Sequence, residues 1–359
     1  MLKVQHIKFL FLSLIASAMT VSSARAAEWF PYPVEVWNPP FNMQSPRVQK
    51  DYVALPKASK KWEICVSFPH MKDAYWLGVD YGVVEEAKRQ GVKMQLVEAG
   101  GYTELNTQIS QIEDCVSAGA DAVIIGAISF DGLNNLVSEV RKKGIPVIDV
   151  INGMSSSELS AKSLVSFGEM GAKAGDFVAQ RHPAGGSSAR VAWFPGPPGA
   201  GWVEAGHAGF TGAIEGSAVN LVETKYGDTG KEAQSKLVED TLEAHPDLDY
   251  IVGTAVTAEA AVSILRARGL SDKVKIVSYY YTPGVHEGIK RKRILAAPTD
   301  QTVIQGRVAI DQAVRILEGK SFEKHVGPRL FVVSQDNIGD FDSTTTLAPD
   351  GFKPVFRVQ

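Results

Sequence analysis

A regular alternation of strand-like and helix-like segments is the feature that most limits the folds open to this chain. From Trp62 onward, short apolar runs alternate with segments in which apolar residues recur at the helical period. Strands are expected at 62–68, 93–98, 122–126, 146–151, 164–167, 190–194, 220–226, 250–253 and 275–280. Helices are expected at 75–90, 103–118, 133–143, 172–181, 202–215, 231–244 and 258–268. This order is typical of α/β folds with parallel sheets covered by helices.

A loop-like break at 152–163 divides the alternation, so two sheets in two lobes are expected, with a hinge and a central cleft. The predicted lobe 1 comprises 62–152 and about 297–330. The predicted lobe 2 comprises 153–296 together with the C-terminal strand and tail to residue 359. In such open sheets, ligands bind beyond the carboxyl ends of the strands.

The first residues predict export from the cytoplasm. Lys3 and Lys8 precede an apolar run at 9–18, and Ala24-Arg25-Ala26 supplies the small residues of a cleavage site. This is the plan of a secretory signal peptide, expected to cover 1–26 and to be removed. No later stretch is long and apolar enough for a membrane span. The product is expected to be soluble and periplasmic.

The remaining N-terminal segment and the two cysteines carry separate expectations. Residues 27–61 are rich in proline and aromatic side chains, which favours an extended arm lying on a lobe. Cys65 and Cys115 are expected to form a disulfide, because an exported protein lies in an oxidising compartment. The alternative is two buried free thiols.

The sequence offers little for catalysis, cofactors or large charged partners. The loop at 69–73 lacks the glycines of a dinucleotide site, and the glycine-rich 195–201 lacks the Lys-Ser/Thr ending of a phosphate loop. Neither Gly-x-Ser-x-Gly nor His-Glu-x-x-His occurs, and the histidines show no metal-ligand spacing. A net charge of −3 gives no reason to expect nucleic acid or membrane as a partner. The chain is therefore expected to be no enzyme and to hold no metal or cofactor.

Aromatic residues recur in the loops that follow the predicted strands. Several of them at one edge of the sheets predict a lined pocket. The residues singled out in these loops are Asp73, Tyr75, Trp76, Tyr102, Trp202, Tyr280 and Asp300. Asp73 has a second interpretation, because it precedes a helix and is a favourable N-cap.

Five short segments resemble type I periplasmic binding proteins. They are 72–76 (KDAYW), 97–102 (VEAGGY), 253–255, 258–261 and 299–301. More narrowly, these segments resemble the members of that family that sense trimethylamine N-oxide (TMAO). The resemblance implies two lobes that close on a small ligand. It also implies a sensor that engages the periplasmic domain of a membrane histidine kinase and so regulates TMAO respiration.

The resemblance implies a set of ligand-binding residues, namely Asp73, Tyr75, Trp76, Tyr102, Phe167, Trp202, Tyr280 and Asp300. Aromatic faces suit the methyl groups and cationic nitrogen of TMAO, and a tyrosine or tryptophan donor suits its oxygen. At Phe167 the family often has tryptophan, so another methylamine or a sulfoxide stays an alternative ligand. A receptor of an ABC importer, for a sugar or another methylated amine, is the alternative function.

Overall fold

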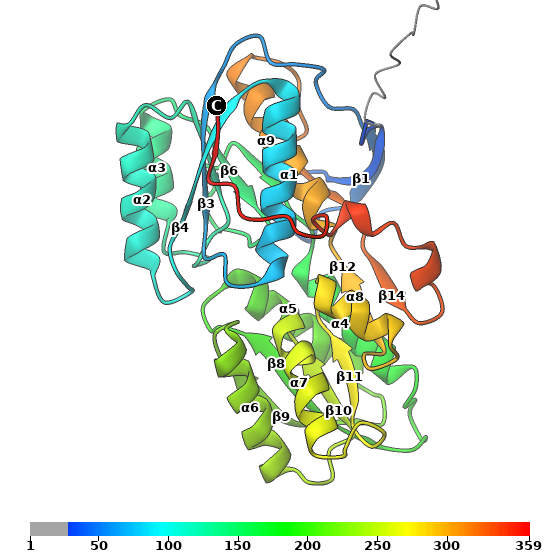
Figure 1. Ribbon diagram of the computed structural model, residues 1–359. Helices are drawn as coiled ribbons and strands as arrows, with labels where there is room; N and C mark the ends of the chain where they lie inside the picture. Colours follow the sequence, from blue (N-terminus) through cyan, green and yellow to red (C-terminus); the bar gives the residue numbers. More distant parts are fainter. Residues whose placement is uncertain (1–27) are drawn as a thin grey trace, which may run out of the picture.

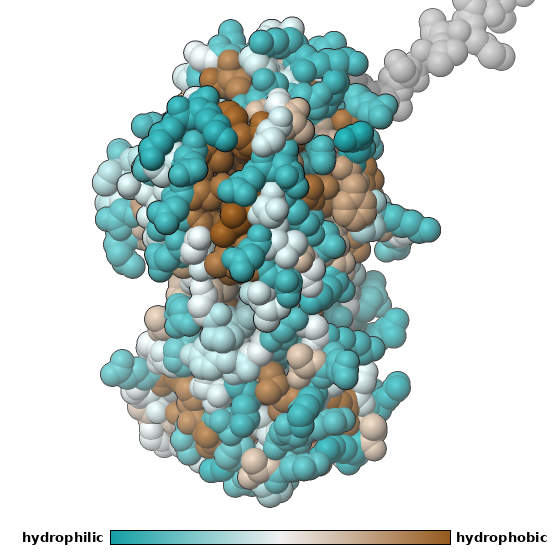
Figure 2. All heavy atoms as spheres, turned by 90° about the vertical axis from the view of Figure 1, so that its left-hand side faces the viewer, coloured by the Kyte–Doolittle hydropathy of each residue, from teal (hydrophilic) through white to brown (hydrophobic). Residues whose placement is uncertain are grey.

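The computed structural model describes residues 28–359, and these form two α/β lobes joined by a hinge (Figure 1). The predicted signal peptide at 1–26 lies outside the described residues. Between Glu28 and Gln359, no helix has both the length and the apolar character needed to cross a membrane. Seen after a 90° turn, apolar side chains gather in a band on the first lobe between polar margins (Figure 2).

The first lobe is built on a nine-stranded sheet, the upper body of Figure 1. Its strand order is β15-β4-β3-β5-β6-β7-β13-β1-β2. The bounds are β1 Tyr32–Trp37, β2 Arg47–Tyr52, β3 Glu63–Phe68, β4 Lys93–Glu98, β5 Ala122–Ile125, β6 Val147–Val150, β7 Ala161–Ser163, β13 His325–Pro328 and β15 Arg357–Val358. The strands from β4 to β13 run parallel, whereas β1, β2 and β15 are antiparallel to their neighbours.

Two helix pairs cover the two faces of this sheet. The helices are α1 Ala74–Gln90, α2 Leu105–Ser117, α3 Asn134–Lys142 and α9 Thr302–Leu317. Because side chains alternate along a strand, Val66 packs on the α1 and α9 side, and Cys65 on the α2 and α3 side. Helices α1 and α9 pack closely at Gly82, where an added Cβ would lie 2.3 Å from the Val303 carbonyl oxygen.

The second lobe has a four-stranded parallel sheet in the order β11-β10-β8-β9. Its strands are β8 Ala189–Gly196, β9 Val219–Tyr226, β10 Tyr250–Gly253 and β11 Lys275–Ser278. Its helices are α4 Phe167–Ala179, α5 Gly201–Ile214, α6 Lys231–Ala244, α7 Ala255–Ala267 and α8 Pro283–Lys290. A two-stranded ribbon of β12 (Ala296–Thr299) and β14 (Phe331–Ser334) lies between the lobes (Figure 1).

The α/β fold with two parallel-sheet lobes is confirmed, but the predicted lobe boundaries differ from the structure. Strand β7, expected in lobe 2 or within a break, belongs to the first sheet and pairs with β6 and β13. The strand expected at 164–167 is instead the crossing into α4, which begins at Phe167. A three-residue strand is too short to show a period of two, so its pattern was not recognisable.

The C-terminal tail and the segment before β3 also differ from the expectation. The tail to residue 359 was predicted in lobe 2, but β15 pairs with β4 in lobe 1. The Val355 amide holds the tail on α1 by donating to Asp80 Oδ2 over 2.8 Å. The arm predicted at 27–61 is, over residues 28–61, more than an extended arm, since β1 and β2 form a hairpin that β13 joins to the sheet.

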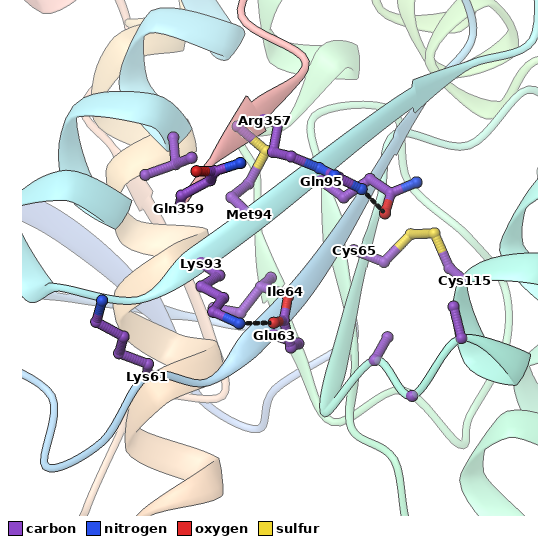
Figure 3. Close-up of a pocket in the computed structure, with 14 residues that line it drawn as sticks. Lys61, Glu63, Ile64, Cys65, Lys93, Met94, Gln95, Cys115, Arg357 and Gln359 are labelled. Carbon is purple, nitrogen blue, oxygen red and sulfur yellow. Dashed lines mark hydrogen bonds and ion pairs between the residues drawn. A yellow bond between two sulfur atoms is a disulfide. The ribbon is translucent and has the colours of Figure 1, made fainter.

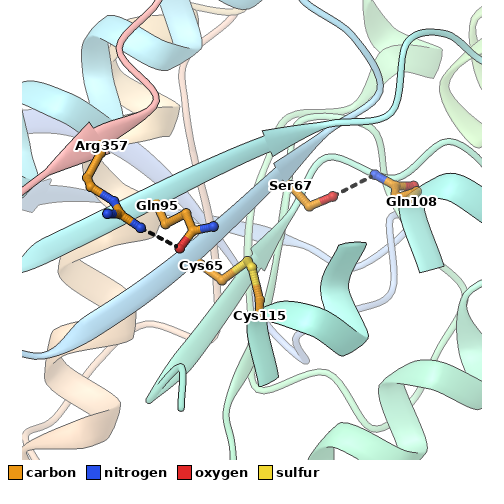
Figure 4. The surroundings of a disulfide bond; sticks show 6 residues. All are labelled: Cys65, Ser67, Gln95, Gln108, Cys115 and Arg357. Atoms are coloured by element: carbon orange, nitrogen blue, oxygen red, sulfur yellow. Dashed lines mark hydrogen bonds between the residues drawn. A yellow bond between two sulfur atoms is a disulfide. The ribbon is translucent and has the colours of Figure 1, made fainter. Parts of the chain in front are cut away.

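Cys65 on β3 and Cys115 on α2 are joined by a disulfide (Figure 4). Cys65 is 1% exposed and Cys115 5% exposed. The bond ties one covering helix to a central strand of the first sheet, on the face opposite α1.

Candidate ligand-binding site

The first lobe supplies one wall of a small aromatic cage. Asp73 follows β3 and caps α1, its Oδ1 accepting from the backbone N of Tyr75 (3.1 Å) and of Trp76 (3.4 Å). This cap fixes the first turn of α1, so both rings project from the carboxyl end of the sheet. Tyr102 comes from the loop after β4, and Asn152 Nδ2 donates to its hydroxyl oxygen over 2.9 Å.

The second lobe supplies the opposite wall. Phe167 is the first residue of α4, Trp202 the second of α5, and Tyr280 follows β11. The rings meet across the cleft: Tyr75 and Tyr280 lie 5.0 Å apart edge to face, and Tyr102 and Trp202 lie 6.0 Å apart. Aromatic rings from both lobes therefore enclose one space.

The enclosed space is small. The cavity measures about 20 Å³ as the volume open to the centre of a water molecule. Its lining residues are Asp73, Tyr75, Trp76, Tyr102, Asn152, Phe167, Trp202, Thr229 and Tyr280. A single water needs roughly 10–15 Å³ by such a measure, so this closed cage suits a ligand of few heavy atoms. A ligand as large as a sugar would require the cage to widen further, and it would find few fixed partners for its hydroxyl groups.

Seven of the eight predicted ligand-binding residues line this cavity, and Asp300 does not. Asp300 lies behind Tyr75, whose hydroxyl donates to its Oδ2 over 2.5 Å. Gln305 Nε2 donates to the same oxygen over 2.9 Å. Burial raises the pKa of Asp300 to about 6, and these bonds partly oppose the shift. Asp300 therefore orients Tyr75 within the cage.

The cage keeps its tyrosines as neutral hydroxyl groups. Burial raises the pKa of Tyr75, Tyr102 and Tyr280 well above the usual value for tyrosine. The Trp202 indole N–H is buried near the Tyr102 hydroxyl without a well-formed hydrogen bond. The Tyr102 hydroxyl and the Trp202 indole are thus donors available to a ligand oxygen.

Polar contacts between the lobes flank the cage. His70 Nε2 lies 3.0 Å from Thr229 Oγ1, and Lys72 Nζ lies 3.3 Å from Asp228 Oδ2. The Lys72 backbone N–H donates to His70 Nδ1, so Nε2 carries the proton and donates to Thr229. Burial lowers the pKa of His70 to about 4, so this contact is made by a neutral ring. The structure therefore represents the lobes in a closed arrangement.

Sequence reasoning missed two residues of the cage, Asn152 and Thr229. Asn152 follows β6, and its Nδ2 also donates to the Ala127 carbonyl oxygen over 2.7 Å. Thr229 lies between β9 and α6. Both follow the carboxyl end of a strand, so the rule that located the aromatic residues would have found them had it not been restricted to rings.

Larger cavities lie outside the cage, and two of them share residues with the features described above. One of about 480 Å³ lies at the amino ends of β3 and β4, where Cys65 and Cys115 form part of its lining (Figure 3). Three of its charged side chains have partners: Lys93 pairs with Glu63, and Arg357 donates to Gln95. Another cavity of about 360 Å³ lies beyond the cage wall and shares Asn152, Phe167 and Trp202 with it.

No metal site accompanies the cage. Across residues 28–359, no group of three or more histidine, cysteine, aspartate or glutamate side chains is placed to hold an ion. The cavity lining offers aromatic faces, hydroxyl groups, the Asn152 amide and one carboxyl group, that of Asp73.

The sequence is similar to a known protein family and to known proteins of that family. The family model for the periplasmic binding protein domain matches residues 64–321. The periplasmic protein TorT of Escherichia coli K12 is 37% identical over 305 residues, covering 84% of this chain and 86% of TorT. The ribose import binding protein RbsB of Bacillus subtilis is 25% identical over 280 residues, covering 77% of this chain and 88% of RbsB.

Two solved structures are closely similar. An ABC transporter solute binding protein from Bradyrhizobium sp. BTAi1, with bound Bis-Tris, is 63% identical with a TM-score of 0.80. The match covers 92% of this chain and all of that one. TorT in complex with the TorS sensor domain in the presence of TMAO is 35% identical with a TM-score of 0.76. That match covers 82% of this chain and all of the solved chain.

Proposed function

The chain belongs to the periplasmic binding protein family as a relative of TorT, and on that premise we propose that it is a TMAO sensor. The family membership agrees with the predicted type I periplasmic binding protein fold and the periplasmic location. In the proposal, TMAO binds in the aromatic cage, and the closed protein engages the sensor domain of a TorS-like histidine kinase.

The observation that carries the proposal is a small closed cage with aromatic walls from both lobes. TMAO presents three methyl groups on a cationic nitrogen, and ring faces such as those of Trp76 and Trp202 attract both. Its anionic oxygen can accept from the Tyr102 hydroxyl and the Trp202 indole N–H. Because the walls come from both lobes, the ligand favours the closed arrangement over an open one.

We expect TMAO to bind with a dissociation constant in the micromolar range or weaker. TMAO has five heavy atoms, and the best small ligands gain about 1.5 kcal/mol per heavy atom, which limits binding to about −7.5 kcal/mol. That value corresponds to a dissociation constant of a few micromolar. Calorimetry with TMAO, betaine, choline and ribose, in a buffer free of Bis-Tris, measures it. Tighter binding of ribose than of TMAO would contradict the proposal, as would a nanomolar TMAO dissociation constant.

Small-angle X-ray scattering tests the closure. We expect TMAO to shift an ensemble of open and closed molecules toward the compact form, because Tyr75 and Tyr280 meet only when the lobes close.

The partner is tested by titrating the sensor domain of a TorS-like kinase with and without TMAO. By linkage, TMAO must change the affinity for the kinase domain by the factor with which that domain changes the affinity for TMAO.

A second candidate function is supported by the relative from Bradyrhizobium, which is described as an ABC transporter solute binding protein. In that case the same cage would deliver a methylated amine to an importer. Co-purification decides between the two: a kinase sensor domain supports the sensor, and a membrane permease supports the importer.

A further inference from the structure

A cavity of about 320 Å³ lies beside the ribbon between the lobes, and we call it the hinge pocket. Its wall includes three aromatic rings and two carboxylates, those of Tyr32, Phe331, Asp340, Phe341 and Asp342. Phe331 is 38% exposed, and its ring lies 5.3 Å from that of Phe341, edge to face. Strand β14 and the turn that follows it project from the side of the molecule at the level where the lobes meet (Figure 1). The pocket is therefore open to a second protein.

The two carboxylates of the hinge pocket have no cationic partner. Asp340 and Asp342 are both exposed, and neither forms an ion pair within residues 28–359. Asp342 Oδ1 accepts from the Thr344 backbone N over 3.0 Å and from the Thr344 hydroxyl over 2.6 Å, so it caps a short turn. Two unpaired carboxylates beside ring faces are the surroundings that a cationic side chain prefers.

A chain of contacts ties the hinge pocket to the ligand cage through lobe 1. The hydroxyl of Tyr32, on β1, donates to Gln301 Oε1. Gln301 is 3% exposed and is the neighbour of Asp300, which accepts from the Tyr75 hydroxyl in the cage. The position of the Tyr32 ring in the pocket wall is therefore linked to that of Tyr75.

A second contact ties the hinge pocket to lobe 2. The ring of Phe341 lies 5.1 Å from that of Tyr281, edge to face. Tyr281 is 1% exposed and directly follows the cage residue Tyr280. Because one wall is linked to lobe 1 and the other to lobe 2, closure of the lobes sets the spacing between the rings of the pocket.

We propose that the hinge pocket receives an arginine side chain of the kinase sensor domain, and that the closed arrangement of the lobes favours this contact. The inference rests on the proposed function and adds to it the place where the partner binds. A guanidinium is planar, so it can stack on a ring and donate two parallel hydrogen bonds to a carboxylate at the same time. A lysine ammonium lacks this geometry, and a neutral or acidic side chain would leave both carboxylates without a counter-charge.

The test is calorimetry of the mature protein with the sensor domain of a TorS-like kinase, at two salt concentrations. The decisive variant is Asp340→Asn with Asp342→Asn, because asparagine keeps the cap at position 342 while both charges are removed. We expect its affinity for the sensor domain to fall at least about tenfold at low salt, since charge-assisted bonds are lost. The wild-type affinity should also decrease more steeply with salt than that of the variant. The affinity of the variant for TMAO should be unchanged, because neither carboxylate lines the cage.

Asp336→Asn with Asp350→Asn is the matched control. These two carboxylates are exposed and lie outside the hinge pocket, so the net charge changes by the same amount without touching its wall. This control should bind the sensor domain as the wild-type protein does. An equal loss of affinity in both double variants would overturn the proposal, because net charge alone would then explain it. Unchanged affinity and salt dependence in the pocket variant would overturn it as well.

Phe341→Leu tests the link to the cage. Leucine keeps an apolar side chain but removes the ring that contacts Tyr281. In the wild-type protein we expect TMAO to raise the affinity for the sensor domain about fivefold or more. In the variant, whose folding is checked by a melting curve, this factor should fall toward one. An equal factor in both proteins, or a lower sensor-domain affinity with TMAO, would show that closure does not favour the contact.

The wild-type titrations separate this inference from the proposed function. A wild-type protein that binds TMAO but no sensor domain would overturn both the kinase partner and the proposed occupant of the hinge pocket. A wild-type protein that binds the sensor domain but not TMAO would overturn the proposed ligand, and the Asp340→Asn, Asp342→Asn comparison would still decide where the sensor domain binds.

Discussion

Replacing Trp76 with alanine is expected to abolish measurable TMAO binding. Trp76 is 2% exposed and forms part of the cage wall, and its ring packs 4.7 Å from that of Phe68. Its removal deletes one ring face for the cationic nitrogen and opens the cage to water. Losing a central aromatic anchor costs about 2–4 kcal/mol of binding free energy, or roughly a 30- to 1,000-fold loss of affinity. From a micromolar starting point, this places binding near the limit of calorimetry.

The same substitution also removes core volume, so stability must be measured alongside binding. A buried tryptophan replaced by alanine lowers the free energy of unfolding by about 3–5 kcal/mol. Circular dichroism and a melting curve establish whether the variant is folded at the assay temperature. Trp62→Ala is the matched control, since Trp62 lies outside the cage under the Lys60 ammonium group. A folded Trp76→Ala protein with unchanged affinity would contradict the cage.

Gly126→Ala offers a subtler test of the same wall. A Cβ at position 126 would lie 2.6 Å from Trp76 Cη2, so the ring must move. The cavity has little spare volume, and a displaced ring intrudes on the ligand. We expect reduced TMAO affinity with the full set of cage side chains still present.

Removing the disulfide is the second change with a large expected effect, and it acts on stability. Cys65 and Cys115 are separated by 50 residues, a loop whose closure stabilises the folded chain by up to about 4 kcal/mol in the chain-entropy model. The double variant Cys65→Ala, Cys115→Ala should lose about 2–4 kcal/mol of unfolding free energy in a denaturant titration. Both cysteines are buried in the first lobe, so the loss should fall on that lobe.

TMAO binding provides the control for this variant. The disulfide borders a cavity at the amino ends of β3 and β4, whereas the cage lies beyond the carboxyl ends. The folded fraction should therefore keep its affinity. Counting thiols on denatured, unreduced wild-type protein checks the bond itself: two reactive thiols would show that no disulfide forms.

Much of the cage could be predicted because its position follows from a general rule. Parallel strands gather their carboxyl ends at one edge, so Tyr75, Trp76, Tyr102 and Tyr280 were candidates from the order of elements alone. Asp300 was a candidate by the same reasoning, yet it follows β12 of the antiparallel ribbon, and its side chain turns toward Tyr75 and Gln305. Such an orientation depends on packing between segments far apart in the sequence, which local patterns do not encode.

The lobe boundaries were harder to predict for a related reason. Strand β15 has two residues and β7 has three, so neither shows the alternation that identifies a strand. Their place in the sheet is set by neighbouring strands whose backbone groups would otherwise lack hydrogen-bond partners. For β15 this neighbour is β4, at Met94 and Gln95. Arg357 of β15 pairs with Gln95, and Lys162 of β7 pairs with His325, so these pairings join segments far apart in the sequence.

The position of β13 has a consequence for the order in which the protein can fold. Val34 in the N-terminal hairpin pairs with Pro328, so the hairpin joins the sheet only when the last part of the chain is present. The second sheet, by contrast, is formed from one uninterrupted stretch between β8 and β11. Contacts between sequence neighbours form faster than contacts that close long loops. During synthesis or refolding, the second lobe should therefore acquire hydrogen-exchange protection first, and the β1–β2 hairpin last.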